Sequence, residues 1–177
     1  MFRTGLLTDT AVATTGPARP AIVERLASLG ADVRPLHLAS DEHAPEEAVG
    51  VHALVVDAAA PFAGRGGEED ELAPLRAAAD DAWIATRAVA NAAWIEADEP
   101  GGKVVFVAPR PGDGVHAAAA RAALENLART LSIEWSRYGI RTTTIAPGAE
   151  WSDDEVAGFV AYLVSPAGEY FSGTRLG

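Results

Sequence analysis

Five charged or ionisable residues directly follow or closely trail apolar runs that predict strands, and they are candidates for a ligand site. They are Asp9, Asp57, Arg110, Asp113 and His116. In open parallel sheets, ligands bind in the crevice outside the carboxyl ends of the strands. A small-molecule binding site built from these carboxylates, cations and imidazole is therefore one hypothesis for the chain.

Two other patterns of chemically active residues are weaker. His37, His43 and His52 have acids nearby, but they form no i, i+4 histidine pair and no known ligand spacing. The loop Gly64 to Gly67 is rich in glycine, yet it lacks the preceding strand and the Lys-Ser/Thr ending of a phosphate-binding loop. We expect neither a metal site nor a phosphate cradle there.

Composition limits the partners. The chain has 177 residues with 14 basic and 25 acidic side chains, a formal charge of -11. Phosphate backbones and anionic membrane surfaces select for basic proteins, so we expect no nucleic acid and no membrane partner. The sequence has no cysteine and no run of the roughly 20 apolar residues that a membrane span requires. These features favour a cytoplasmic protein.

Strand and helix patterns alternate along the chain, which predicts one α/β domain over residues 1–177 with a mostly parallel sheet and helices on both faces. The apolar or β-branched runs predict strands at 5–8, 31–36, 51–56, 103–108, 140–145 and 170–176. Helical spacing and end signals predict helices at 20–29, 71–96, 115–137 and 152–164. Ser152 and Glu155 have the spacing of a capping box at the start of the last helix.

The segments 120–131, 134–135, 138–141 and 145–148 closely resemble the second half of the short-chain dehydrogenases/reductases. The resemblance extends through 83–88, 102–107, 156–163 and 171–173 and covers most of the chain from residue 51 onward. It implies a Rossmann-like, doubly wound parallel sheet, here shortened to about five to six strands. The family binds NAD(P) and transfers hydride with a Tyr-Lys pair, assisted by Ser and Asn.

The positions that match the family's catalytic residues carry other side chains. Aligning on Arg121 to Leu124 places Ala117 at the tyrosine and Arg121 at the lysine. Ala78 falls at the asparagine, and no hydroxyl follows the strand that ends near Pro109. Alanine carries no proton, and arginine stays charged at physiological pH. His116, beside the missing tyrosine, is a possible substitute acid.

The family's cofactor positions are also altered. If 5–8 is the first strand, Asp9 stands at the first glycine of the dinucleotide motif. If the motif instead begins at Gly16, residues 17–20 replace its remaining glycines. The resemblance places the remnant of the cofactor cleft at Asp9, Gly16, Asp57, Ala58, Pro147 and Gly148, and we expect no bound cofactor.

The two long helices are retained, and in this family such helices commonly pair with those of a second subunit. Alanine-rich faces permit close helix approach, and large side chains supply apolar area. The predicted interface residues are Trp83, Arg87, Trp94, Leu124, Leu127, Leu131 and Trp135. One side of each helix must also cover the sheet, which accounts for part of this apolar pattern.

The leading hypothesis is a pseudoenzyme that associates with itself or with an active paralogue through these helices. The rival is an NAD(P)-dependent oxidoreductase with relocated catalytic groups, such as His116, Arg121 and Tyr138. The third is the small-molecule binding module described first.

Overall fold

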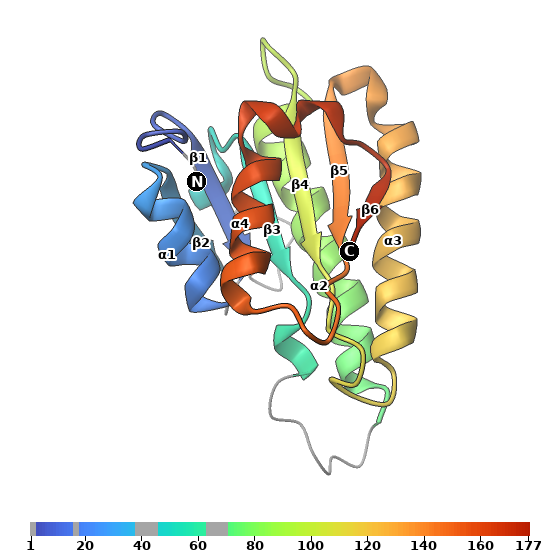
Figure 1. Ribbon diagram of the computed structural model, residues 1–177. Coiled ribbons are helices and arrows are strands. Elements are labelled where there is room, and N and C mark those ends of the chain that lie inside the picture. Colours follow the sequence, from blue (N-terminus) through green and yellow to red (C-terminus); the bar gives the residue numbers. More distant parts are fainter. Residues whose placement is uncertain (1–2, 16–17, 38–45, 63–70) are drawn as a thin grey trace.

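The computed structural model describes residues 3–15, 18–37, 46–62 and 71–177, and these form a parallel sheet of six strands (Figure 1). The order across the sheet is β2-β1-β3-β4-β5-β6. The strands are β1 (Ala11–Thr15), β2 (Asp32–Leu36), β3 (Ala53–Asp57), β4 (Gly102–Val107), β5 (Ile140–Ile145) and β6 (Thr174–Leu176). The order reverses direction at β1 and β3, as in doubly wound folds. The predicted α/β class is confirmed.

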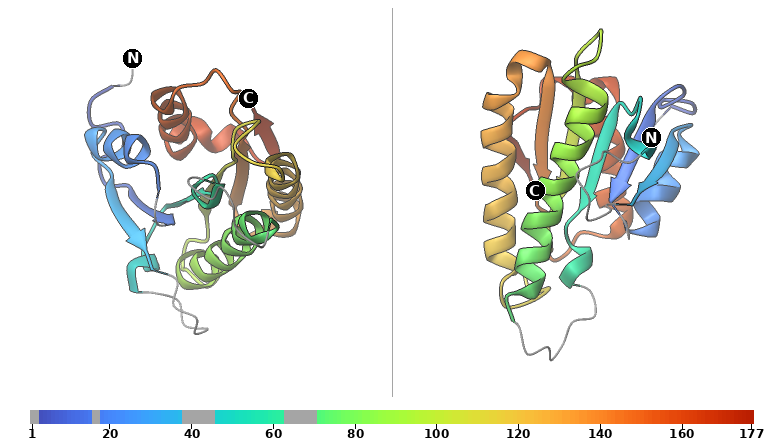
Figure 2. Two further views of the ribbon diagram at one scale, coloured as in Figure 1. Left: turned by 90° about the horizontal axis from the view of Figure 1, so that it is seen from below. Right: turned by 180° about the vertical axis from the view of Figure 1, so that it is seen from behind.

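Helices cover both faces of this sheet (Figure 2). Helices α1 (Pro20–Ser28) and α4 (Asp153–Val164) share a core with one face, whereas α2 (Ala73–Val89) and α3 (Ala117–Glu134) pack on the other. Helix α4 begins with the predicted capping box, because Ser152 and Glu155 satisfy each other's backbone N–H groups. Among the described residues, no helix is long and apolar enough to cross a membrane.

The central strands are buried on both faces. All five residues of β3 and the last four of β4 are buried, which explains their continuous apolar sequences. Strand β5 is rich in threonine because two hydroxyls reach helix α3. Thr142 Oγ1 donates to the carbonyl of Ala128 at 2.5 Å and Thr144 Oγ1 to that of Leu124 at 3.1 Å. These bonds let polar side chains be buried without an unmet hydrogen bond.

The prediction of a first strand at 5–8 is wrong. These residues form turns between Gly5 and Asp9, both of which have positive φ. Leu7 is fully buried, but its N–H donates to the carbonyl of Leu29, after α1, at 2.9 Å rather than to a strand. The first strand is β1, whose small alanine and threonine residues gave a weaker apolar signal.

The predicted helix at 71–96 has a change of winding near its end. The α-helical winding of α2 ends at Val89, and a π-helical turn, η3 (Ala90–Trp94), follows directly. This turn carries Trp94 into the core, where its indole N–H donates to the carbonyl of Val51 at 2.7 Å. The ring lies so close to Gly102 that a Cβ at that position would overlap it.

Both edges of the sheet are short. Strand β2 forms one edge with five residues, including Pro35, and pairs with β1. Strand β6 forms the other edge with three residues and pairs with β5. The remaining short helical turns are η1 (Glu46–Ala48), η2 (Ala60–Phe62), η4 (Ser136–Tyr138) and η5 (Pro166–Tyr170).

Candidate functional site

A buried carboxylate lies at the carboxyl end of β3, where the strand order reverses. The side chain of Asp57 is completely buried. Its Oδ2 accepts a hydrogen bond from the backbone N–H of Arg19 at 2.9 Å and lies 3.3 Å from Arg19 Nε. Its Oδ1 accepts from the N–H of Ala59 at 3.3 Å. Burial raises the pKa of Asp57 above its usual value, and the nearby Arg19 charge partly offsets this effect.

A second carboxylate extends this pair across the same edge. Asp153, in the first turn of α4, lies 3.5 Å from Arg19 Nη1 and 2.7 Å from Arg110 Nη2. The hydrogen bond from Arg110 is the main reason that the pKa of Asp153 is lowered. The order Asp57, Arg19, Asp153, Arg110 is therefore a chain of alternating charges, which we call the ion-pair chain. It links the starts of α1 and α4 to the end of β3 and to the segment that follows β4.

Arg110 is also fixed by backbone groups. Its Nε and Nη2 donate to the carbonyl of Trp151 at 3.2 and 2.9 Å. Its own N–H donates to Asp113 Oδ2 at 2.7 Å, which closes the loop after β4. These contacts hold the end of the ion-pair chain in place.

Arg121 lies beside this chain and binds three backbone carbonyls. Its Nη1 donates to Pro109 at 2.7 Å and to Pro147 at 2.9 Å, and its Nη2 donates to Ala146 at 3.1 Å. These carbonyls belong to the segments that follow β4 and β5. Partial burial, with a smaller contribution from the Arg175 charge, lowers the pKa of Arg121 below its ordinary value. An arginine so shifted still remains charged near neutral pH, so it acts here as a fixed cation.

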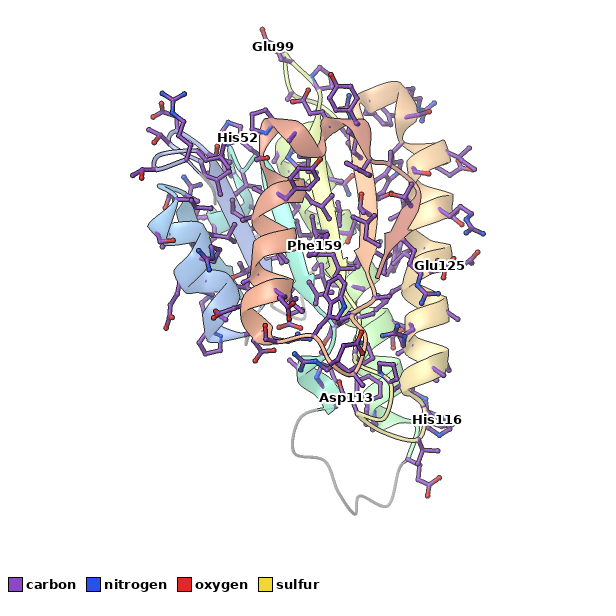
Figure 3. The ribbon with its side chains drawn as sticks, viewed as in Figure 1. His52, Glu99, Asp113, His116, Glu125 and Phe159 are labelled. Carbon is purple, nitrogen blue, oxygen red and sulfur yellow. The ribbon has the colours of Figure 1, made fainter. Side chains whose placement is uncertain are left out.

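The two alanine positions carry no group that can transfer a proton, and the two candidate substitutes lie far apart. Ala78 on α2 and Ala117 on α3 are both buried. His116 lies at the N-cap of α3, and Figure 3 shows it at the lower end of that helix, pointing away from the sheet. Tyr138 lies in η4, beyond the opposite end of α3. The structure therefore does not bring His116 and Tyr138 together as the rival hypothesis requires.

The predicted cleft is only partly brought together. Asp57, Ala58, Pro147 and Gly148 lie at the carboxyl edge, after β3 and β5. The predicted position of Asp9 in this cleft is wrong, because Asp9 precedes β1 and so lies at the opposite edge of the sheet. Gly16 lies outside the described residues, as do His43 and the loop Gly64 to Gly67.

The predicted interface set divides into outer and inner residues. Trp83 and Arg87 are exposed on α2, and Trp135 is half-buried and stacks on Trp83 with ring centroids 6.3 Å apart. Leu127 is also half-buried. The prediction that Trp94, Leu124 and Leu131 belong to an interface is wrong, because these residues are buried in the core between the helices and the sheet. Their size covers the sheet within this chain and leaves them no surface for a second subunit.

Arg19 and Asp153 are the residues that the sequence reasoning missed. Arg19 stands directly before Pro20 at the start of α1, and Asp153 directly after the cap residue Ser152. An acidic residue in the first turn of a helix is favoured by the helix dipole alone, so the position of Asp153 in the sequence does not indicate a long-range partner. A cation directly before the first crossover helix was the available signal.

A cavity lies at the amino edge of the sheet, away from the ion-pair chain. It has a volume of about 500 Å³ and is lined by the residues that begin β3, β4 and β5 together with the end of α4. Figure 3 shows His52 and Glu99, two of its lining residues, at the end of the molecule opposite Asp113 and His116. The residues that the structure describes hold no group of three or more potential metal ligands.

Comparisons with known proteins find a short sequence match and several similar structures. No family model matches the chain. A stretch of 35 residues is 63% identical to a probable 2,4-dienoyl-CoA reductase [(2E)-enoyl-CoA-producing] of Bacillus subtilis, and it covers 19% of this chain and 14% of that protein. This match thus spans a small part of that relative.

Solved structures match over nearly the whole chain. A short-chain dehydrogenase/reductase from Serratia marcescens has a TM-score of 0.73 and 21% identity, covering 96% of each chain. BdcA in complex with NADPH, a protein also solved from E. coli, has a TM-score of 0.71 and 22% identity, covering 97% of this chain and 93% of that one. At these identities the matches establish the fold.

Proposed function

Because the chain has the fold of the short-chain dehydrogenases/reductases, we propose that it is a non-catalytic member of that fold group. In this proposal it neither binds NAD(P) nor transfers hydride, and it acts as a subunit that associates with itself or with an active paralogue. The observation that carries the proposal is the placement of Arg121, whose guanidinium is held by three carbonyls at the position that aligns with the family's lysine.

The proton-transfer chemistry supports this reading. Hydride transfer to a carbonyl needs a proton donor within hydrogen-bond reach of the substrate oxygen. Ala117 and Ala78 supply none, and His116 points away from the sheet. Arg121 stays protonated near neutral pH and is already bound to backbone oxygens, so it is unsuited to exchange a proton.

The charges at the carboxyl edge of the sheet also support the proposal that the chain does not bind NAD(P). A dinucleotide in this fold places its pyrophosphate at the end of the first strand, next to the first helix. Here the ion-pair chain occupies the same end of the sheet, with Asp57 and Asp153 supplying two negative charges. A pyrophosphate would have to approach these carboxylates or separate them from Arg19 and Arg110, and both steps cost free energy.

The outer surface of α2 and α3 supports the association part of the proposal. Figure 2 shows the two helices side by side on the face of the molecule away from α1 and α4. Trp83, Ile84 and Ile133 are exposed there, with 41%, 42% and 69% of their surface accessible. Large exposed apolar side chains on one face are typical of an interaction surface.

Titration calorimetry with NADH and NADPH tests the first part of the proposal, and we expect no saturable heat at micromolar to millimolar nucleotide. Sedimentation of the purified chain, alone and mixed with a related active dehydrogenase, tests the second part. We expect an oligomer that Trp83→Ser dissociates and Val49→Ser leaves intact, because Val49 is also an exposed apolar residue but lies outside the two helices. A monomer that captures no related dehydrogenase would refute the association.

A second candidate function is an NAD(P)-dependent oxidoreductase with atypical catalytic residues. The observation that favours it is the match to a structure solved with NADPH over nearly the whole chain. In this case the ion-pair chain would open to admit the nucleotide. Saturable NADPH binding, weakened by substitution of Arg19 or Arg110, would support this candidate and exclude the first.

A further inference from the structure

The cavity at the amino edge of the sheet carries a pair of neighbouring cations. Lys103 and Arg141 occupy the same register on the adjacent strands β4 and β5. Side chains in register on neighbouring parallel strands point to the same face, here the face covered by α4. Both residues line the cavity of about 500 Å³. This volume lies within the range of small-molecule sites.

The contacts of these cations leave part of their donor capacity unused. Lys103 Nζ donates to the carbonyls of Val164 and Ser165 at 3.2 and 2.6 Å. Arg141 donates through Nε to the carbonyl of Glu169 at 2.7 Å and through Nη1 to that of Gly139 at 3.2 Å. Among the described residues Arg141 Nη2 has no hydrogen-bond partner, and Lys103 has a third N–H left.

The charges around this pair favour an added anion. Burial lowers the pKa of Lys103, and the neighbouring charge of Arg141 lowers it further, whereas Glu169 acts in the opposite direction. The side chain of Glu169, which is 56% exposed and lies 3.8 Å from Lys103 Nζ, offsets the effect of burial only in part. An anion between the two cations would relieve their repulsion. The carbonyls of Val164 and Ser165 at the end of α4, which would repel an anion, already accept hydrogen bonds from Lys103.

Two further hydrogen-bonding residues, Thr10 and His52, line the same cavity from the positions directly before β1 and β3. The backbone N–H of Ala11 donates to His52 Nδ1 at 3.0 Å, so the neutral imidazole carries its proton on Nε2. Neither His52 Nε2 nor the Thr10 hydroxyl has a partner within the part of the chain that is described, and both residues line the cavity. They are suited to hydroxyl or carbonyl oxygens of a ligand. Glu99, exposed in the lining, disfavours a second negative charge.

We propose that this cavity binds a small polar organic molecule with a single anionic group, a carboxylate or a phosphate. Arg141 and Lys103 hold the anionic group, and His52 and Thr10 hydrogen-bond to the polar remainder. The site is at the opposite edge from the ion-pair chain, and the proposal is independent of whether a nucleotide binds there.

Gluconate, glucose 6-phosphate and glucose form a matched set of probes, because they share a polyhydroxylated body and differ in the head group. Titration of the isotope-labelled protein, followed through the backbone amide NMR signals of Gly101, Gly102 and Lys103, measures binding at this edge. We expect saturable shifts with gluconate, with glucose 6-phosphate or with both, and no saturation with glucose. The comparison of the two charged probes distinguishes a carboxylate from a phosphate ligand.

Two variants and a control make the test specific. Arg141→Gln should weaken binding of the charged probe by about tenfold or more, since a charge-assisted hydrogen bond is lost. Arg129→Gln removes a cation from the exposed face of α3 and should leave binding unchanged. If Arg141→Gln does not fold, a second variant is His52→Ala. The His52 side chain is exposed, and its loss should still weaken binding several-fold.

The proposal is overturned if millimolar gluconate and glucose 6-phosphate leave the cavity amides unmoved, or if glucose saturates equally well. It is also overturned if the shifts map to Ala58 and Ala59 at the carboxyl edge, or if a folded Arg141→Gln protein binds as tightly as the original chain. A failure of this kind leaves the nucleotide and sedimentation experiments unaffected, so the two proposals are tested separately.

Discussion

Replacement of Arg121 by methionine removes the three hydrogen bonds that join the segments after β4 and β5. The acceptors are the carbonyls of Pro109, Ala146 and Pro147, at 2.7 to 3.1 Å. Methionine keeps a long apolar side chain, so little packing is lost, but the carbonyls lose a charged donor. At about 1 kcal/mol of net stability for each bond, the cost is about 3 kcal/mol. For a chain of this length that corresponds to a fall in Tm of about 6–12 °C.

Urea unfolding followed by circular dichroism measures this loss as a lower midpoint at constant m-value. The matched control is Arg129→Met, which removes a single ion pair with Glu125 at 3.0 Å on the exposed surface of α3. Such pairs contribute little, about 0.2–1 kcal/mol. Arg121→Lys retains the charge but not the planar fork, so it should recover part of the stability. If Arg121→Met costs no more than the control, the carbonyl contacts do not stabilise the fold and the argument for a structural Arg121 is refuted.

Three further predictions concern other parts of the molecule. Burial raises the pKa of Asp57 above 3.8, so the folded protein binds this proton more tightly than the unfolded chain and loses stability as pH rises from about that value through the raised pKa. Asp57→Asn should lack this component. The unfolding free energy of the original chain minus that of Asp57→Asn should therefore decline as pH rises from 3, and a difference that stays constant with pH would contradict this. Gly102→Ala should destabilise by about 1–3 kcal/mol because its Cβ overlaps Trp94, whereas the same substitution in a Trp94→Leu background should cost less, and equal costs in both backgrounds would exclude the steric explanation. Ser152→Ala should lower Tm by about 2–4 °C because the capping box of α4 is lost, while Ser152→Asp, which can also cap, should stay near the original value in the same thermal scan.

Most elements could be predicted because their sequences carry strong local signals. The apolar runs of β3 and β4, and the Ser152 and Glu155 spacing before α4, follow from burial on both faces and from capping. The sequence does not indicate strand β1, because alanine and threonine give a weak apolar pattern while Leu6 and Leu7 nearby give a stronger one. Leu7 is buried by contacts with α1 and the strands around it, and burial alone does not distinguish a turn from a strand.

The candidate site was less predictable, since its contacts join residues far apart in the chain. Arg121 could be identified as a substitution at a family position, but nothing near it in sequence indicated three carbonyl partners. The pairing of Arg19 with Asp57 and Asp153 depends on how the end of β3 meets the starts of α1 and α4. A regular α-helix would place Trp94 on the outer surface, whereas the π-helical turn η3 carries it into the core.

The proline in the outermost strand restricts how copies of this chain can aggregate. Pro35 has no N–H, so β2 lacks one of the donors that an incoming strand would need, and Arg34 beside it places a charge on the same border. The opposite border, β6, offers only Thr174 to Leu176, with Arg175 in the middle. Short, charged or proline-containing borders are poor templates for intermolecular strand addition and for amyloid growth. The proposed association through helical surfaces does not use these borders, and the chain is expected to resist fibril formation even at high concentration.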